Sequence, residues 1–382
     1  MKYLDCFMDY ESNLKKDIEI FQYENLQDEY YKPEHRNVFD VKSYWLDMKD
    51  LHYFYSETVL LNNFIDFKRK KVLFLIHPES SSFYQDKIDD SEPGPIFKGR
   101  STSSSRTLLV YSKDDPSLIF FAKLSLDKFV SGVVRTIPKG EVTRSIGTTK
   151  ILDFLKMKEV LPKRFEYFRE VVGIIPKDME RGGCIIREVH PELFRSAEIM
   201  PCFSLYTKQK DTLNLCSFPL HILYKKYQKG ETFEDFVSRS FISPFIKQYL
   251  ELAILGISTE SHGQNLIVKF DGESFIFYYR DFGGFNIDLK YIKEKYDYPI
   301  DTLPCITNIH EDYFQDKHDE SLQQCFNKYF YTGIIWEIFQ LNKKEYSYHL
   351  LISRLVYKYL DNYNNNFEIY IKNYIEDKRK FV

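Results

Sequence analysis

Histidine, amide, arginine and carboxylate side chains flank two short apolar runs between residues 259 and 284. The first run covers residues 266–270 and the second covers 274–279, with Asp271-Gly272 between them. Asp-Gly between two such runs is typical of a two-residue type I′ turn, because both central residues of that turn need positive φ. The stretch therefore predicts a β-hairpin.

A two-residue turn also predicts which residues of this hairpin face each other. Phe270 would lie opposite Glu273, Asn265 opposite Tyr278, and His262 opposite Asp281. The open end of the hairpin would then gather most of the polar residues of the stretch: Glu260, His262, Gln264, Asn265, Arg280 and Asp281. This arrangement is more typical of a binding site than of a solvated loop.

A second hairpin is predicted from the apolar runs 108–112 and 118–124. With the five-residue connection 113–117, Ser112 faces Leu118 and Thr107 faces Lys123. Its open end would also be polar, with Ser103, Ser104, Ser105, Arg106, Thr107 and Lys123. Residues 127–136 follow with helical spacing, which predicts Ser131 and Arg135 on one helix face.

Together these groups suit the chemistry of a nucleoside triphosphate. Arginine binds phosphate and carboxylate oxygens through a planar fork, and lysine acts as a point charge. Hydroxyl groups and loop N–H groups add neutral donors for an anion. Carboxylates such as Glu260 and Asp281 would hold Mg²⁺, which prefers oxygen ligands and shares them with phosphate.

Each group also has a purely structural interpretation. The serine run is typical of a flexible loop, and Arg135 could simply pair with Glu141 on the surface. His262 could be a hydrogen-bonded structural histidine, and Asp281 could cap a turn. His310 and His318 lie among acidic residues, but their spacing fits no closed zinc pattern.

Composition limits the class of protein. The chain has 382 residues, 43% of them hydrophobic and 29% charged, which is typical of a soluble globular protein. A net charge of −3 gives no support for nucleic-acid binding. Six scattered cysteines without CxxC spacing are expected to be reduced. There is no long apolar run and no secretory signal, so we expect no membrane association and a cytoplasmic location.

The remaining patterns predict an α+β fold. Residues 1–70 indicate mixed helix and loop, 71–76 a buried strand that ends at His77-Pro78, and 79–105 a loop. Residues 182–188 contain another strand. From about residue 213 the pattern is mostly helical, including a helix over 233–255 that Pro244 divides and Gly256 ends, and further helices over 325–341 and 346–370. We therefore expect three units: 1–70, 71–205 and 206–382.

Several short motifs occur in one order along the chain. They are His77-Pro78 after a strand, S-R-T at 105–107, K-L-S at 123–125, R-x-I-P at 135–138, C-I-I-R-E at 184–188, H-G-Q-N at 262–265 and R-D-F-G-G at 280–284. This set resembles the NRPS-independent siderophore (NIS) synthetases, the aerobactin-synthetase-like IucA/IucC family, over residues 70–290. The resemblance implies a β-hairpin-rich, fingers-like nucleotide-binding region followed by a mostly helical, palm-like region that carries the central hairpin.

The resemblance also implies an activity, which is that of an ATP- and Mg²⁺-dependent ligase in siderophore or related biosynthesis. It would adenylate a citrate-like carboxylic acid and pass the acyl group to an amine or hydroxyl. Arg106, Lys123, Arg135 and His262 would be catalytic, and the implied nucleotide contacts are Ser103, Ser105, Arg106, Thr107, Lys123, Gln264 and Asn265. The acid would contact His77, Ser131, Arg135 and His262, and Mg²⁺ would bind Glu260 and Asp281. The family also suggests a homodimer.

Two departures from the family pattern concern the acid. The family's chains are longer at the N-terminus and carry a His-Pro-x-His-Pro-x-x-Lys motif that this sequence lacks. Glu79-Ser80 stand where the family has Trp-Gln. The resemblance therefore supports ATP binding better than citrate recognition.

Two other functions remain open at the level of sequence. HGQN…RDFGG is similar to the kinase pattern His-Gly-Asp…Asp-Phe-Gly, which suggests a phosphotransferase or nucleotidyltransferase. However, Gln264 stands where a kinase needs its catalytic aspartate, and no Gly-rich phosphate loop is present. The third candidate is a non-catalytic relative that binds nucleotide.

Overall fold

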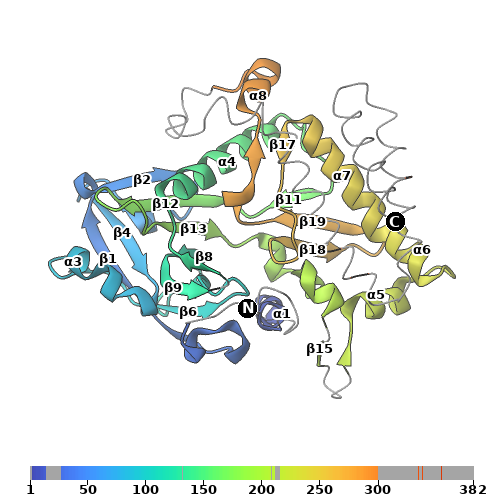
Figure 1. Ribbon diagram of the computed structural model, residues 1–382, viewed down its shortest axis with the longest axis horizontal. Helices are drawn as coiled ribbons and strands as arrows, with labels where there is room; N and C mark the ends of the chain where they lie inside the picture. Colours follow the sequence, from blue (N-terminus) through green and yellow to red (C-terminus); the bar gives the residue numbers. More distant parts are fainter. Residues whose placement is uncertain are drawn as a thin grey trace.

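The computed structural model describes residues 2–13, 27–130, 132–207, 209–210 and 216–299, with the single positions 334, 338 and 354. In this part of the chain, helices pack around two main β-sheets (Figure 1). The predicted mixture of α and β structure is confirmed. The division into fingers-like and palm-like regions and the three unit boundaries stay predictions. Some predictions fall outside the described residues. They are the His310–His318 cluster and, apart from the three single positions, the helices over 325–341 and 346–370.

The larger sheet is antiparallel and holds ten of the described strands, in the order β2-β12-β13-β8-β7-β6-β1-β4-β3, with β5 paired to β1. Their bounds are β1 Phe39–Asp47, β2 Leu51–Tyr55, β3 Ile65–Asp66, β4 Lys71–Ile76, β5 Glu92–Pro93, β6 Phe97–Ser101, β7 Thr107–Tyr111, β8 Ile119–Leu124, β12 Glu170–Pro176 and β13 Cys184–Glu188. Strands β4, β8, β12 and β13 are buried along almost their whole length, and their sequences are mostly apolar.

Several local predictions for this sheet are confirmed. Strand β4 covers residues 71–76, and His77 then has an extended backbone before Pro78. The β7–β8 hairpin has the predicted register, with Thr107 opposite Lys123. This register places Lys123 on an interior strand, because β8 also pairs with β13 on its other side.

The prediction of only helix and loop over residues 1–70, and of loop over 79–105, is wrong. Strands β1 and β2 lie in the first segment and β6 lies in the second. The first six residues of β1 (Phe39–Asp47) alternate largely between buried and exposed positions. Its outward residues are polar, so the strand contains no apolar run that would reveal it.

The smaller sheet has the order β11-β19-β18-β14 and carries the central hairpin. Its strands are β11 Phe165–Tyr167, β14 Ile199–Pro201, β18 Leu266–Phe270 and β19 Phe275–Tyr279. Helix α7 (Ser243–Ile254) packs against it through rings such as Phe245, whose centroid lies 5.3 Å from that of Phe277. The predicted hairpin exists, but its predicted register is wrong.

The register differs by two residues because the connection is a four-residue loop. Phe270 lies opposite Phe275, not Glu273. The Asp271 carboxylate accepts hydrogen bonds from the N–H groups of Glu273 and Ser274, both at 2.9 Å. Within the loop only Gly272 has positive φ, so the type I′ turn does not form.

The helix predicted over residues 127–136 is also wrong. This segment forms a two-stranded hairpin of β9 (Leu126–Val130) and β10 (Val133–Arg135). Gly132 turns the chain with φ of 85°, and the β-branched residues on either side favour strand over helix. Ser131 lies outside the described residues, and Arg135 ends a strand.

The long helical pattern over 233–255 is confirmed in its divided form. Helix α6 (Phe233–Val237) passes through a π-helical turn, Ser238–Ile242, into α7. Pro244 lies just after the π-helical turn, so the helix changes its hydrogen-bond pattern next to the residue that has no N–H to donate. Gly256 follows the helix with φ of 74°, which glycine adopts without strain.

Helix α1 (Lys2–Ser12) lies between the two sheets (Figure 1). Its residues Leu4, Phe7 and Met8 share one face and are almost fully buried. They form one apolar cluster with Phe121 of the larger sheet and Ile267 of the smaller one. The helix therefore packs on both sheets at their junction.

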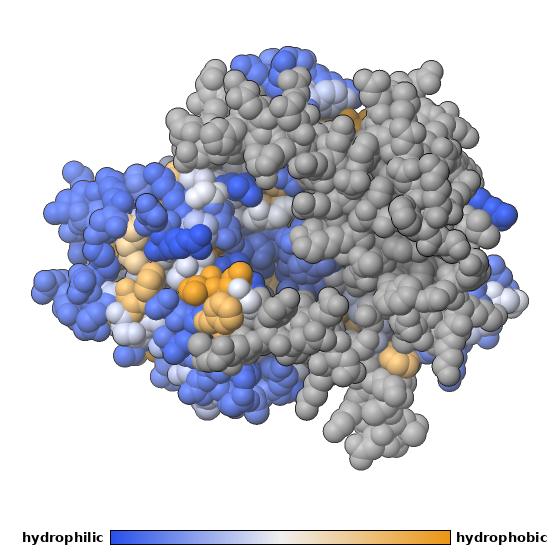
Figure 2. Space-filling view, viewed as in Figure 1, coloured by the Kyte–Doolittle hydropathy of each residue, from blue (hydrophilic) through white to orange (hydrophobic). Residues whose placement is uncertain are grey.

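The remaining described helices and strands complete these layers. They are α2 Leu61–Phe64, α3 Gln85–Ile88, α4 Lys139–Met157, α5 Pro219–Tyr227, α8 Leu289–Tyr296, and the short pairs β15 Gln209–Lys210 with β16 Cys216–Ser217 and β17 Ile257–Ser258 with β20 Asn286–Ile287. Figure 2 shows a mostly hydrophilic described surface with a small hydrophobic patch. Among the described helices, none has the length and apolar character that a membrane span needs.

Candidate active site

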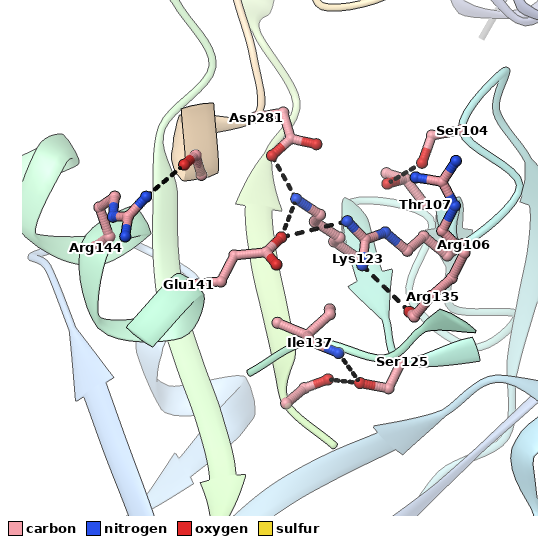
Figure 3. Close-up of polar contacts among 12 residues, drawn as sticks. Ser104, Arg106, Thr107, Lys123, Ser125, Arg135, Ile137, Glu141, Arg144 and Asp281 are labelled. Atoms are coloured by element: carbon pink, nitrogen blue, oxygen red, sulfur yellow. Dashed lines mark hydrogen bonds and ion pairs between the residues drawn. The ribbon is translucent and has the colours of Figure 1, made fainter. Parts of the chain in front are cut away.

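The ends of the two predicted hairpins meet at the side chain of Lys123 (Figure 3). Lys123 is 1% exposed, and its ammonium contacts the carboxylate of Asp281, just beyond β19. The same ammonium lies 2.6 Å from Glu141 Oε1, in the first turn of α4. Three elements that are distant in sequence thus share one buried cation.

Arg106 and Arg135 complete this charged cluster. The Arg106 guanidinium lies 3.3 Å from Glu141 Oε1 and donates a hydrogen bond of 3.2 Å to the backbone carbonyl of Arg135. Arg135 Nε donates to the Val130 carbonyl at 2.9 Å, within the β9–β10 hairpin. We call Arg106, Lys123, Arg135, Glu141 and Asp281 the charged cluster.

Two candidate residues have strained backbones. Ser105 has φ of 61° and Asp281 has φ of 67°. Residues other than glycine rarely adopt this left-handed backbone region. Ser105 stands in the loop 102–107, where Ser104 Oγ and Thr107 Oγ1 lie 3.0 Å apart. Such strain tends to gather at functional sites, because the surrounding structure must hold it.

The charges of the cluster strongly affect one another. Burial alone would raise the pKa of Asp281, but Lys123, Arg187 and Arg106 outweigh it and hold this pKa well below its usual range. Burial also opposes ionisation of Glu141, yet Lys123 and Arg106 keep its pKa below the usual value. Burial, and then the charge of Arg106, lower the pKa of Arg135. Both carboxylates are therefore ionised at neutral pH.

Three cations and two carboxylates give the cluster a net charge of +1. The carboxylates keep the cations in place while no anion is bound, since buried like charges would otherwise repel. Their side chains are partly accessible, with 18% exposure for Glu141 and 21% for Asp281. The arrangement suits an incoming polyanion that exchanges these contacts for its own.

A tight turn, Phe282–Gly284, directly follows Asp281. The side chain of Glu260 lies against the last residue of this turn, Gly284. The Gly283 carbonyl accepts a hydrogen bond of 2.8 Å from Arg144 on α4. A Cβ atom at Gly284 would overlap the Glu260 carboxylate, so glycine is needed for this close approach. Asp281 and Glu260 therefore flank one three-residue turn.

The assignment of these two carboxylates to Mg²⁺ stays a prediction. Such an ion is usually held by one or two carboxylates plus substrate oxygens and water. No group of three or more His, Cys, Asp or Glu side chains suited to a metal occurs among the described residues.

The H-G-Q-N residues lie beside Glu260. The Asn265 amide donates to Glu260 Oε2 at 3.3 Å, and His262 Nε2 lies 4.0 Å from Glu260 Oε1. His262 Nδ1 accepts from the Gln264 N–H at 3.2 Å. The Gln264 side chain points elsewhere, to the Ser103 carbonyl at 2.7 Å.

His77 is not part of this charged cluster. It is fully buried beside the rings of Tyr31 and Phe39, and its Nδ1 accepts from the Glu79 N–H at 3.3 Å. Burial lowers its pKa to about 3, so it is neutral. The assignment of His77 to the acid stays a prediction, and the same holds for Ser131.

Sequence reasoning missed three charged residues near the site. Glu141 was weighed only as a surface partner of Arg135, but it contacts Lys123 and Arg106. Glu11 and Arg187 are both buried. Glu11 lies far from every motif, and Arg187 belongs to C-I-I-R-E but was not assigned to the site. The sequence signal for Glu141 is its place three residues after R-x-I-P, in the first turn of a helix.

Part of this site lies in a stretch that is similar to a known family. Residues 90–207, which include the loop 102–107, Lys123 and Glu141, match the family model described as IucA / IucC family. This stretch is therefore similar to that family, as the motifs indicate. No curated protein matches it.

Solved structures with the same fold include siderophore-related proteins. The chain is similar to the petrobactin biosynthesis protein AsbB from Bacillus anthracis str. Sterne, with 19% identity and a TM-score of 0.63 over 91% of this chain and 63% of that one. It is also similar to the ATP-bound aerobactin synthetase IucA from a hypervirulent pathotype of Klebsiella pneumoniae, with 16% identity and a TM-score of 0.64 over 94% of this chain and 73% of that one. The aerobactin synthetase IucC from the same pathotype gives 15% identity and a TM-score of 0.57, covering 87% and 65%.

Proposed function

We propose that this protein is an ATP-dependent ligase that adenylates a carboxylic acid and transfers the acyl group to an amine or a hydroxyl. The observation that carries the proposal is the contact of Lys123 with both Asp281 and Glu141, which joins the two motif-bearing hairpin ends in one charged cluster. The family match and the fold shared with an ATP-bound synthetase support it.

The cluster would act by neutralising charge. A carboxylate oxygen of the acid would attack the α-phosphorus of ATP, and pyrophosphate would leave with the electrons of the broken P–O bond. Arg106, Lys123 and Arg135 would stabilise the added charge on the phosphate oxygens. The amine would then attack the acyl carbon, and AMP would leave. No protein nucleophile is required.

Other residues would position the substrates. Ser105 and Thr107 would donate to the triphosphate from the loop 102–107, and His262 would lie between phosphate and acid. Gln264 and Asn265 would contact the nucleotide. Glu260 and Asp281 would hold Mg²⁺, which neutralises phosphate charge when bound.

The acid and its acceptor are proposed only by class. A citrate-like polycarboxylate fits the family and the arginine-rich cluster, and siderophore or related biosynthesis is the corresponding role. A cytoplasmic homodimer is the proposed form. Because the chain spans 63% of AsbB, the activity of that whole protein is not transferred to it.

Product analysis tests the activity directly. The protein would be incubated with ATP, Mg²⁺, a panel of carboxylic acids, and hydroxylamine as a surrogate amine. We expect AMP, pyrophosphate and a hydroxamate with at least one polycarboxylate. ADP as the product would instead establish a phosphotransferase. Bound but unconverted ATP with every acid would favour the non-catalytic relative.

A further inference from the structure

A buried ion pair connects helix α1 to the end of the central hairpin. Glu11 is fully buried and Arg280 is 5% exposed. The pair is bidentate, with 2.5 Å between Arg280 NH1 and Glu11 Oε1 and 3.1 Å between NH2 and Oε2. Planar bidentate pairing fixes orientation as well as distance.

Both partners also hold the two loops of the candidate site. Glu11 Oε2 accepts from the Ser103 N–H at 2.9 Å, and Arg280 NH2 donates to Ser103 Oγ at 3.1 Å. Arg280 donates to the Gln264 carbonyl from Nε at 3.0 Å and from NH2 at 2.7 Å. The two loops are also joined directly, because the Gln264 side-chain amide donates to the Ser103 carbonyl at 2.7 Å.

Stability alone does not explain this arrangement. A buried ion pair is often no more stabilising than apolar side chains of similar volume, because both charges must lose water. Helix α1 is already anchored by the apolar cluster of Leu4, Phe7 and Met8. What apolar residues could not supply is a fixed set of hydrogen bonds to Ser103 and Gln264.

These two anchors belong to the two stretches that carry the proposed nucleotide contacts. Ser103 lies in the loop 102–107, which also carries Ser105, Arg106 and Thr107. Gln264 stands between His262 and Asn265. Any shift of either anchor would move the groups that follow it.

We propose that Glu11 and Arg280 are positioning residues, which lock both loops against helix α1 in the geometry that binds nucleotide. This inference rests on the proposed function. It assigns α1, at the start of the chain, a direct part in shaping the site. We call Glu11, Ser103, Gln264 and Arg280 the α1 latch.

A purely electrostatic role predicts a different outcome. If the two charges acted only through their field at the phosphates, Glu11→Gln would strengthen ATP binding and Arg280→Gln would weaken it. A positioning role predicts that both substitutions weaken binding. It also predicts that the double variant is little worse than the more severe single variant, because both break one unit.

The experiment combines two readouts on the full chain. Amide hydrogen exchange of residues 102–107 and 262–265 is measured without nucleotide, and ATP affinity is measured by calorimetry. Arg100→Gln is the matched control, because Arg100 donates to the Met8 carbonyl, Asp9 and Ser12 of α1 but to no site loop.

We expect Glu11→Gln and Arg280→Gln to speed exchange in both loops and to weaken ATP binding by about tenfold or more, since small displacements of positioning groups are costly. Arg100→Gln should leave both readouts close to wild type. Unchanged loop exchange, opposite signs for the two variants, or faster exchange with unchanged affinity would each overturn the latch. Absence of ATP binding by the wild-type protein would instead contradict the proposed function, while the exchange data would still decide whether the latch holds the loops.

Discussion

Lys123 can be buried in the larger sheet because two carboxylates receive its ammonium. A buried charge is costly unless it is paired, and the Lys123 ammonium contacts both Asp281 and Glu141. The motifs predicted Lys123 and Asp281 as site residues from separate hairpins. Their direct contact depends on how the two sheets pack, which local patterns do not contain.

His77 illustrates the limit of a motif at the scale of one residue. His77-Pro78-Glu79 and His190-Pro191-Glu192 are the same tripeptide, and each histidine Nδ1 accepts an N–H from the residue two positions later. Only His77 is fully buried, while His190 is 18% exposed. Burial is a property of the fold, so the tripeptide alone could not distinguish the two.

Burial of His77 predicts a pH dependence of stability. Its pKa falls from the ordinary 6.5 to about 3, so the unfolded chain takes up a proton below pH 6.5 that the folded chain excludes until about pH 3. The free energy of unfolding should therefore decrease as the pH falls through this window. The slope reaches about 1.4 kcal/mol per pH unit, or about 2 kcal/mol between pH 6.5 and 5.

Denaturant unfolding at these two pH values checks this contribution. His77→Asn retains an acceptor for the Glu79 N–H and should lose less stability on acidification than wild type, by about 2 kcal/mol. His190→Asn is the matched control, because His190 stands in the same tripeptide and is not fully buried. An unchanged pH dependence in His77→Asn would show that this histidine is not kept neutral by burial.

The turn Phe282–Gly284 is the element that brings the carboxylates of the site together. A methyl group at Gly284 would displace Glu260, whereas Gly140 in the first turn of α4 has no atom within 4 Å of the equivalent position. We therefore expect Gly284→Ala to raise the Mg²⁺ concentration needed for half-maximal ATP turnover by about tenfold, corresponding to about 1.4 kcal/mol. Gly140→Ala should behave like wild type.

A Mg²⁺ titration of ATP turnover measures this effect, with circular dichroism to confirm that both variants are folded. Equal Mg²⁺ requirements in Gly284→Ala and wild type would mean that Glu260 takes no part in holding the ion. A lower turnover with an unchanged Mg²⁺ requirement would point to general distortion of the turn.

Elements were predictable from the sequence where burial leaves a simple pattern. The buried strands β4, β8 and β13 are apolar runs, and their positions were predicted to within about a residue. The β9–β10 hairpin was missed because its apolar residues at 129–130 and 133–134 also fit helical spacing. Register in the central hairpin was missed because the side chain of Asp271, not the Asp-Gly dipeptide, determines the loop.

At the scale of the whole molecule, the site lies where two sheets meet and helix α1 packs on both. Glu11 and Arg280 are separated by 269 residues in sequence, so no local pattern could pair them. The order of weak motifs was more informative, because it indicated the family and hence which hairpin ends belong together. The residues that hold those ends in place became apparent only from the fold.

The charged cluster is proposed to support adenylation of a carboxylic acid. The most direct measurement is exchange of labelled pyrophosphate into ATP, with and without each acid of the panel. We predict acid-dependent exchange in wild type and at least a hundredfold loss in Arg106→Gln, which removes a charge aimed at the phosphates. Lys139→Gln removes a charge that contacts His52 instead, and should exchange normally. Acid-independent exchange, no exchange with any acid that yields a hydroxamate, or full exchange in Arg106→Gln would contradict the account.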